Sequence, residues 1–187
     1  PSPAQKRTEI KWSLISSLIF ALSGYVLGVL WQQGLTQIRL DLSLSGFWAM
    51  PLSFFLMSLV HEIYFYFTHV WMHHPKFYKK THAIHHLSVK VSPFASFCFH
   101  PYEALVHAAF IPIYALLVPV HPLTIIAYLT FMTLTAVSNH LGLEILWPKF
   151  LQRFFISGTH HSFHHKNMKK NYGLYYTFSD KLFKTEG

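Results

Sequence analysis

The sequence predicts an all-α integral membrane protein, with about four transmembrane or re-entrant helices and a histidine-rich cap at one end. Three observations lead to this fold class. Hydrophobic residues make up 52% of the 187 positions and charged residues only 12%, against roughly 25% in soluble domains. The apolar residues gather in long runs. Fifteen histidines outnumber seven acidic residues, and most of the histidines fall in short clusters.

The composition also excludes several classes of protein. A chain with 18 Phe, 10 Tyr and 5 Trp is too aromatic to be disordered. A single cysteine, Cys98, excludes a disulfide framework and any metal site built on several cysteines. The chain starts at Pro1 rather than at a methionine, which is compatible with a piece of a longer protein.

The first apolar run, Trp12–Trp31, has no charged residue and is 20 residues long. A helix of about 20 residues spans the hydrocarbon core of a bilayer. Tryptophan at each end suits the two membrane interfaces. The run is too long for a signal peptide, and no clear cleavage site follows it. We therefore expect a transmembrane helix here.

Three further apolar runs follow. Gly46–Met72 is long enough to span a membrane, whereas Ala104–Val120 and Leu123–Val137 are each near the lower limit. The two shorter runs therefore fit either two spans or a helical hairpin that enters the membrane and returns. Pro112 and Pro119 predict a kink in the first arm.

The basic residues predict the orientation. With four crossings, the N-terminus, the loop 73–103 and the C-terminal tail share one side, and of the 15 lysines and arginines only Arg39 lies elsewhere. The positive-inside rule then places both termini and the histidine clusters in the cytoplasm. Because these basic residues border apolar runs, we expect them to face anionic headgroups and not a nucleic acid.

Histidines recur in three boxes with ligand-like spacing, and His140 stands alone at the end of the fourth apolar run. On a helix, residues three and four apart share a face, so each box can offer two or three imidazoles to one point. Neutral imidazole binds iron, zinc, copper or nickel, and the boxes therefore predict a metal site. The boxes are His69-Val-Trp-Met-His73, His82-Ala-Ile-His85-His86 and His160-His161-Ser-Phe-His164-His165.

Other histidines have ordinary interpretations. His107 and His121 lie in apolar surroundings typical of core or interface residues, and His74, before Pro75, is placed to cap a helix end. The boxes themselves are interleaved with aromatic residues such as Phe77 and Phe163. They therefore look folded, unlike the polar histidine-rich tracts that store metal.

At this point the sequence resembles the fatty acid hydroxylase / sterol desaturase superfamily, over roughly Phe54 to Thr185. The first apolar run lies outside the resemblance. The segments that carry it are His61–Pro75 (HEIYFYFTHVWMHHP), Phe77-Tyr78, His82–His86 (HAIHH), Ser92–Ala95 (SPFA), Phe99–Pro101 (FHP), Glu103-Ala104, Asn139-His140, Thr159–His165 (THHSFHH), Asn171–Gly173 (NYG) and Asp180–Phe183 (DKLF).

The resemblance implies a membrane enzyme with a histidine-bound di-iron centre that activates O2, zinc being a possible substitute for iron. Members hydroxylate or desaturate lipid C–H bonds in sterols, fatty acyl chains and related lipids. Cytochrome b5 or a ferredoxin or other reductase supplies their electrons. Matched box by box, the resemblance implies these metal ligands: His69, His73, His82, His85, His86, His140, His161, His164 and His165.

Further residues are candidates for supporting roles. His160 could replace His161, because the two are adjacent. His61 lies two helical turns before His69 and could line a substrate channel or orient a ligand, and His100 could contact the second box. Ligating histidines usually donate their other N–H to a carboxylate or carbonyl. The candidates for that role are Glu62, Glu103, Glu144, Asp180 and Asn139.

The chain departs from the family pattern at Phe67, Val70 and Ser179, where the family often has Trp, Arg and Trp. These changes bear on the substrate branch and leave the histidines intact. We expect one membrane-embedded catalytic domain over 1–187, with a tail and first helix in 1–45 and the histidine-box region in 46–185. The bacterial inner membrane and the endoplasmic reticulum both fit.

Two functions without oxygenase activity remain as alternatives. One is a membrane metal- or haem-binding protein that transfers electrons, which needs isolated histidines on facing helices. The other is a zinc-binding scaffold or transporter, against which the scarcity of intramembrane carboxylates argues.

Overall fold

The computed structural model describes residues 1–41 and 48–187. Within these residues the regular structure is helical, apart from two isolated bridges, Ile38 with Val120 and Phe155 with Tyr176. The predicted start of the second run at Gly46 and the boundary between 45 and 46 lie outside the described residues. The elements are α1 (Pro3–Gln32), α2 (Ala49–Met72), α3 (Pro75–Thr81), η1 (His85–Leu87), η2 (Pro93–Phe97), α4 (Pro101–Leu117), α5 (Pro122–Asn139), α6 (Gly158–Lys166) and α7 (Phe178–Leu182).

Three of these helices, α1, α2 and α5, are long and apolar enough to cross a membrane, and α4 is a shorter apolar helix of 17 residues. This confirms the prediction of an all-α integral membrane protein. Helix α1 begins nine residues before the predicted Trp12, because Ser2 caps it and Pro3 occupies its first turn.

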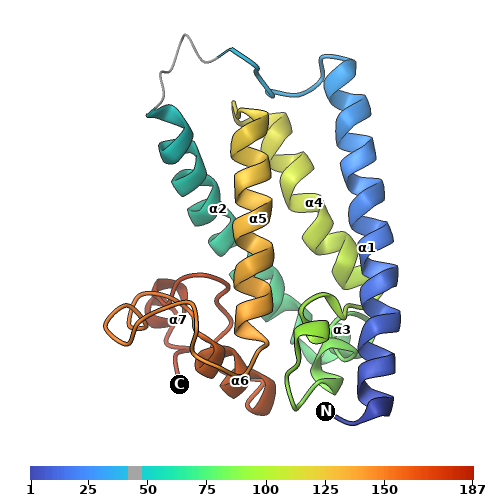
Figure 1. Ribbon diagram of the computed structural model, residues 1–187, viewed down its shortest axis with the longest axis vertical. Helices are drawn as coiled ribbons and strands as arrows, with labels where there is room; N and C mark the ends of the chain where they lie inside the picture. The colour runs from blue at the N-terminus through green and yellow to red at the C-terminus, as the bar shows by residue number, and fades with distance from the viewer. Residues whose placement is uncertain (42–47) are drawn as a thin grey trace.

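The four long helices run side by side, and everything else lies at their two ends (Figure 1). Helix α1 packs on α4, and α2 packs on both α4 and α5. Residues 33–41, which follow α1, lie at one end. At the opposite end lie α3, α6, α7 and both chain termini. The predicted histidine-rich cap at one end of the bundle is therefore present.

Three His-Pro dipeptides start three helices. In each, proline occupies the first turn, and the Nδ1 of the preceding histidine accepts a hydrogen bond from the backbone N–H two residues further on, at 3.3, 3.2 and 3.1 Å. These caps are His74 for α3, His100 for α4 and His121 for α5. The capping interpretation of His74 is confirmed. His100 caps α4, and its ring stacks on Trp12.

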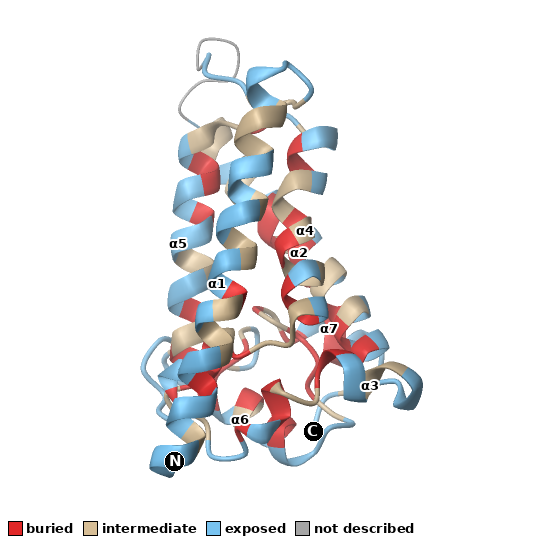
Figure 2. Cartoon of the chain, turned by 90° about the vertical axis from the view of Figure 1, so that its right-hand side faces the viewer, coloured by how far each residue is buried: buried red, intermediate tan, exposed pale blue. Residues whose placement is uncertain are grey.

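Buried residues concentrate between α2, α4 and α5 and in the cap (Figure 2). By contrast, α1 is largely exposed, as expected for a helix that faces lipid. The apolar core comprises Met57, Phe110, Tyr114, Ala115, Val120, Ile125, Tyr128 and Tyr175. Below it, the buried side chains of the cap are predominantly polar, and most of the histidines are among them.

Candidate metal centre

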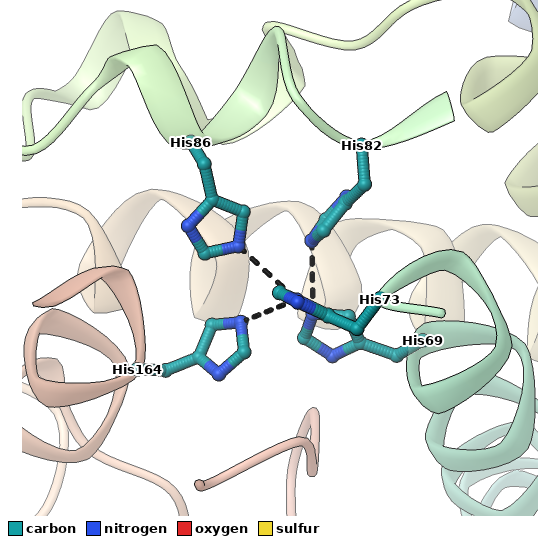
Figure 3. Close-up of side chains that lie close together, drawn as sticks. All are labelled: His69, His73, His82, His86 and His164. Carbon is teal, nitrogen blue, oxygen red and sulfur yellow. Dashed lines mark hydrogen bonds between the residues drawn. The ribbon is translucent and has the colours of Figure 1, made fainter. Parts of the chain in front are cut away.

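All nine histidines that the resemblance implies as ligands come together in the cap, in two clusters. Within each cluster the ligand-type nitrogens lie within 4.8 Å of one another. Cluster one comprises His69, His73, His82, His86 and His164, and cluster two comprises His85, His140, His161 and His165. Figure 3 shows the five rings of cluster one pointing toward one another from three parts of the chain. These donor sets could hold metal ions.

The second and third boxes are each divided between the clusters. His82 and His86 of the second box lie in cluster one, whereas His85 lies in cluster two. His161 and His165 of the third box lie in cluster two, whereas His164 lies in cluster one. Neighbouring residues on a helix point about 100° apart, so adjacent histidines cannot serve the same point. Each of these boxes therefore offers two imidazoles to one cluster, the lower of the two predicted numbers.

The outer nitrogens of the rings fix where the protons are. The Nδ1–H of His69 donates to the carbonyl of Tyr172 at 2.8 Å, and that of His82 donates to Glu103 at 2.6 Å. A neutral imidazole carries one proton, so both Nε2 atoms are bare acceptors. These two Nε2 atoms nevertheless lie 3.0 Å apart. Two facing lone pairs repel unless a cation lies between them.

The spacing of the inner nitrogens fits a metal ion. Ligands on adjacent corners around an ion, with metal–nitrogen bonds of about 2.1 Å, lie about 3.0 to 3.4 Å apart. In cluster one, Nε2 of His73 lies 3.1 Å from that of His164 and 3.2 Å from that of His86. In cluster two, Nε2 of His161 lies 2.9 Å from that of His140 and 3.1 Å from that of His165. The residues present therefore fit two divalent transition-metal ions.

The rings are neutral at physiological pH, as metal ligands must be. Burial, and then the neighbouring His164, lower the pKa of His73 to about 3. Burial also lowers the pKa of His140 and of His164 to about 4, although a backbone hydrogen bond opposes it in each case.

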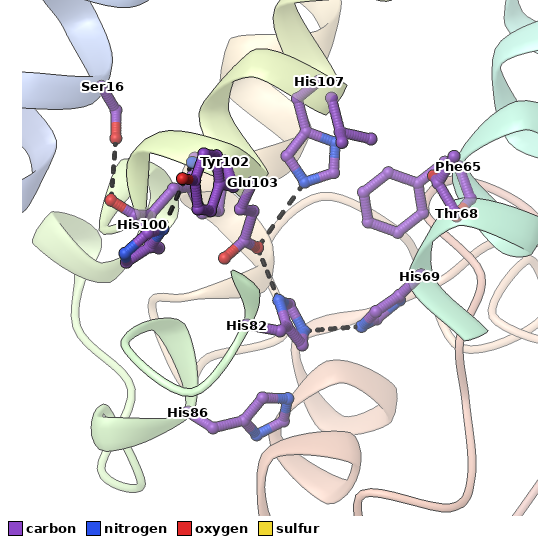
Figure 4. Close-up of polar contacts among 12 residues, drawn as sticks. Ser16, Phe65, Thr68, His69, His82, His86, His100, Tyr102, Glu103 and His107 are labelled. Atoms are coloured by element: carbon purple, nitrogen blue, oxygen red, sulfur yellow. Dashed lines mark hydrogen bonds and ion pairs between the residues drawn. The ribbon is translucent and has the colours of Figure 1, made fainter. Parts of the chain in front are cut away.

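Glu103 supports cluster one from α4. Its carboxylate is fully buried, accepts the hydrogen bond from His82 and lies 3.6 Å from Nε2 of His107 (Figure 4). A carboxylate behind a ligating histidine fixes the ring and raises its basicity. The structure thus gives Glu103 the contact predicted for it. His107 was predicted to be an ordinary core residue, although its position four residues after Glu103 on one helix was a usable signal of this contact.

Glu62 and Asp180 act on the clusters through the backbone. Glu62 accepts hydrogen bonds from the N–H groups of residues 174–176 at 2.8 to 3.3 Å, and Asp180 accepts those of Tyr172 and Gly173 at 2.8 and 2.9 Å. They hold the segment whose Tyr172 carbonyl orients His69. A Cβ on Gly173 would lie 2.8 Å from a carbonyl oxygen and 3.0 Å from both carboxylates, so only glycine fits there.

The remaining candidates lie outside the clusters. His160 bonds to Ser157 through Nδ1, and of the two adjacent histidines His161 is the one that lies in cluster two. Glu144 binds the backbone N–H of Thr159 at the start of α6. Asn139 donates to the carbonyl of Leu174 at 3.5 Å and lines a small cavity beside both clusters.

An apolar cavity of 370 Å³ leads toward the clusters from the membrane-spanning part of the bundle. Its walls come from α1, α2, α4 and α5, and His61 lines it, as one of its two predicted roles required. The Nδ1 of His61 is hydrogen-bonded to the hydroxyls of Tyr128 and Tyr175. The cavity shares six wall residues with the small cavity at the clusters: Phe65, Ser96, Phe99, His107, Ala136 and Leu174.

Known proteins resemble this chain over the part that carries the two histidine clusters. Residues 54–185 match the family described as fatty acid hydroxylase. The chain belongs to the fatty acid hydroxylase family. The match begins in α2 and ends after α7, so it includes every histidine of both clusters and leaves α1 outside. No solved structure matches the chain significantly.

Curated relatives of this fatty acid hydroxylase family member include enzymes of sterol chemistry. Human lathosterol oxidase is 27% identical over 180 residues, which are 95% of this chain and 60% of that protein. Methylsterol monooxygenase 1 of Danio rerio is 32% identical over 69% of this chain and 45% of that protein. A Delta(7)-sterol 5(6)-desaturase of Gibberella zeae is 30% identical over 73% and 38% respectively. The chain thus spans less than two thirds of the length of these relatives.

Proposed function

We propose that this chain oxidises a C–H bond of a sterol or related lipid, using O2 at a di-iron centre held by the nine clustered histidines. The observation that carries the proposal is that the two histidine clusters adjoin an apolar cavity of 370 Å³. Relatives named as a sterol oxidase, a monooxygenase and a desaturase support the same chemistry.

A di-iron centre supplies O2 activation and the removal of hydrogen from an unactivated C–H bond. The chain's own residues supply the surroundings for that reaction. The Tyr172 carbonyl and the Glu103 carboxylate hold the rings of His69 and His82 with Nε2 inward. Phe65 and Phe99 lie in the walls of both cavities, where they would shield the reacting carbon from water. Whether an alcohol or an alkene results depends on how the carbon lies against the centre.

The orientation and the electron donor belong to the same proposal. Both termini and the cap lie at one end of the bundle, which also carries the basic residues beside the third box (Figure 1). We expect this end to face the cytoplasm. Lys166 and Lys169 are exposed there and would attract an acidic donor such as cytochrome b5 or a ferredoxin. We also propose that residues 1–187 act as one catalytic unit.

Metal analysis of purified protein is the first test. The chain should be expressed with added iron and purified in mild detergent without a nickel column. We expect two iron ions per chain, and a large loss of iron in the variant His85→Ala/His164→Ala, which removes one ligand from each cluster. His121→Ala is the matched control, because that histidine caps α5 and lies outside the clusters.

Lipid profiling then tests the reaction. Cells that express the wild-type chain with a suitable reductase should accumulate a lipid changed by one added oxygen or two removed hydrogens, and the double variant should not. A purified chain with one haem would contradict the proposal and favour the electron-transfer alternative. A chain with no bound metal would contradict the metal centre itself.

A further inference from the structure

Helix α1 carries a polar stripe that contacts the residues after the second histidine box. The stripe comprises Gln5, Glu9, Ser13, Ser16 and Ser23. Its five side chains form hydrogen bonds to the segment 88–108, and the four that donate meet their acceptor carbonyls in the same order along both partners. Gln5 donates to the carbonyl of Lys90 at 2.8 Å, Ser13 to Phe94 at 2.8 Å, Ser16 to Phe99 at 3.3 Å and Ser23 to Ala108 at 2.8 Å. Glu9 accepts from Ser88 and Ser92, which lie on either side of Lys90. Figure 4 includes the Ser16 contact. The stripe therefore fixes the register of α1 against this segment.

Glu9 is the centre of the stripe. Its side chain is 1% exposed, although the helix around it is largely exposed. One carboxylate oxygen accepts from Ser88 at 2.8 Å and from Gln5 at 2.7 Å, and the other accepts from Ser92 at 2.5 Å. Within residues 1–41 and 48–187 no lysine or arginine forms an ion pair with it. A buried carboxylate without a cation is costly, so its partners must hold it firmly.

The partners of Glu9 stand at both ends of the loop that follows the second box. Ser88 is the C-terminal cap of η1, and Ser92 is the N-terminal cap of η2. Gln5 binds the middle of this loop at Lys90. The three-residue helix η1 carries His85 of cluster two and His86 of cluster one. One carboxylate therefore restrains the short element that connects the two clusters.

We propose that Glu9 is a positioning residue that holds His85 and His86 in place for the two metal ions, and that α1 is thereby part of the metal centre. The inference rests on the proposed function, since it concerns the same metal ligands. It goes beyond that function because α1 lies outside the residues that match the family.

Metal affinity and the spectrum of bound Co²⁺ test the proposal. Loss of a residue that supports a metal ligand typically weakens metal binding by about 10- to 100-fold. We expect Glu9→Leu, measured by competition with a chelator, to weaken Co²⁺ binding to that extent and to shift the ligand-field absorption. Glu9→Gln keeps an oxygen acceptor and should restore part of both.

Reciprocal substitutions make the test specific. Ser88→Ala/Ser92→Ala removes the same contacts from the other side and should cause a similar loss. Combining it with Glu9→Leu should add little, because coupled substitutions are not additive. Thr8→Val is the control, since Thr8 is exposed and its hydroxyl bonds to its own helix at Ala4.

The outcomes separate this inference from the proposed function. A wild-type chain that binds no metal would overturn both. Wild-type metal binding with an unchanged Co²⁺ spectrum in Glu9→Leu would overturn the positioning role alone, even if the unfolding temperature fell, since that pattern indicates a purely structural contact. A shifted spectrum that Glu9→Gln partly restores would support it.

Discussion

In four of the clustered histidines, the hydrogen bond at Nδ1 decides what Nε2 can do. His69 and His164 donate Nδ1–H to backbone carbonyls of residues 172 and 170, and His140 donates to the carbonyl of Ala136. These carbonyls are fixed by the fold, so the Nε2 atoms face inward without protons. His82 differs because its acceptor is a side chain, Glu103, whose charge can be removed by substitution.

Replacement of Glu103 by glutamine tests that contact. The amide oxygen can still accept from His82, but the negative charge that raises the basicity of the ring is lost. We expect metal affinity to fall by about tenfold or more, with little change in helix content by circular dichroism. Glu186→Gln, at an exposed carboxylate paired with Lys181, should leave the affinity unchanged. Equal affinity for both variants would contradict the role of Glu103.

The buried rings also make stability depend on pH. Burial lowers the pKa of His140 and of His164 to about 4 in the folded chain, whereas an unfolded histidine titrates near 6.5. Between these values the unfolded state binds more protons than the folded state. The contribution of these two rings to stability is therefore fully present above about pH 6.5 and is lost as the pH falls toward 4.

Thermal unfolding of the metal-free chain in detergent should therefore shift to lower temperature between pH 7 and pH 5. Near pH 4 the free energy of unfolding has fallen by on the order of 3 kcal/mol for each of the two rings. An unfolding temperature that rose on acidification would contradict neutral, buried rings.

At the scale of elements, α1 contributes to the cavity as well as to the second box. Phe20, Gly24 and Leu27 line the apolar cavity from this helix. Gly24 lies at an exposed position, and a Cβ added there would meet nothing within 4 Å. A larger side chain at Gly24 therefore has room beside the cavity without displacing the backbone.

Gly24→Phe should reduce lipid turnover by about tenfold, because even a small change in the shape of a hydrophobic pocket has an effect of that order. Metal content should stay at the wild-type level, because Gly24 lies outside both clusters. Gly28→Phe is the matched control: it also has open space around its Cβ, but it does not line the cavity. Equal turnover in the two variants would argue against this cavity as the substrate site.

Across the whole molecule, the distribution of charge fits bound cations. Four of the seven acidic residues, Glu9, Glu62, Glu103 and Asp180, are at most 1% exposed. In the part of the chain that the structure describes, none of the four forms an ion pair with lysine or arginine. Two divalent ions would bring four positive charges into the same region, which would offset the burial of these carboxylates.

Removal of metal should therefore destabilise the whole cap. A ligand present at a thousand times its Kd stabilises a fold by about 4 kcal/mol, which corresponds to roughly 10 °C for a chain of this size. We expect a chelator to lower the unfolding temperature of the loaded wild type by about that amount. The variant His85→Ala/His164→Ala should show a much smaller change, and an equal change would point to an effect of the chelator itself.

The fold class and the set of histidines that cluster were predictable because each depends on local pattern. Long uncharged runs require a helix in a membrane, where the backbone must bond to itself. The spacing of the boxes, with the resemblance it carries, indicated the nine histidines that gather in the cap. The dipeptides His100-Pro101 and His121-Pro122 carry the same local capping signal as His74-Pro75, although a cap was predicted only at His74.

Only the tertiary structure decided how these parts combine. The division of His85 and His164 between clusters depends on where α3, η1 and α6 lie in space. The choice of His161 over His160 follows from which ring faces inward. The contact of Glu9 with Ser88 and Ser92 joins residues about 80 positions apart, as separations of 79 and 83 show. Spacing along a helix determines which side chains share a face, but long-range packing determines what that face meets.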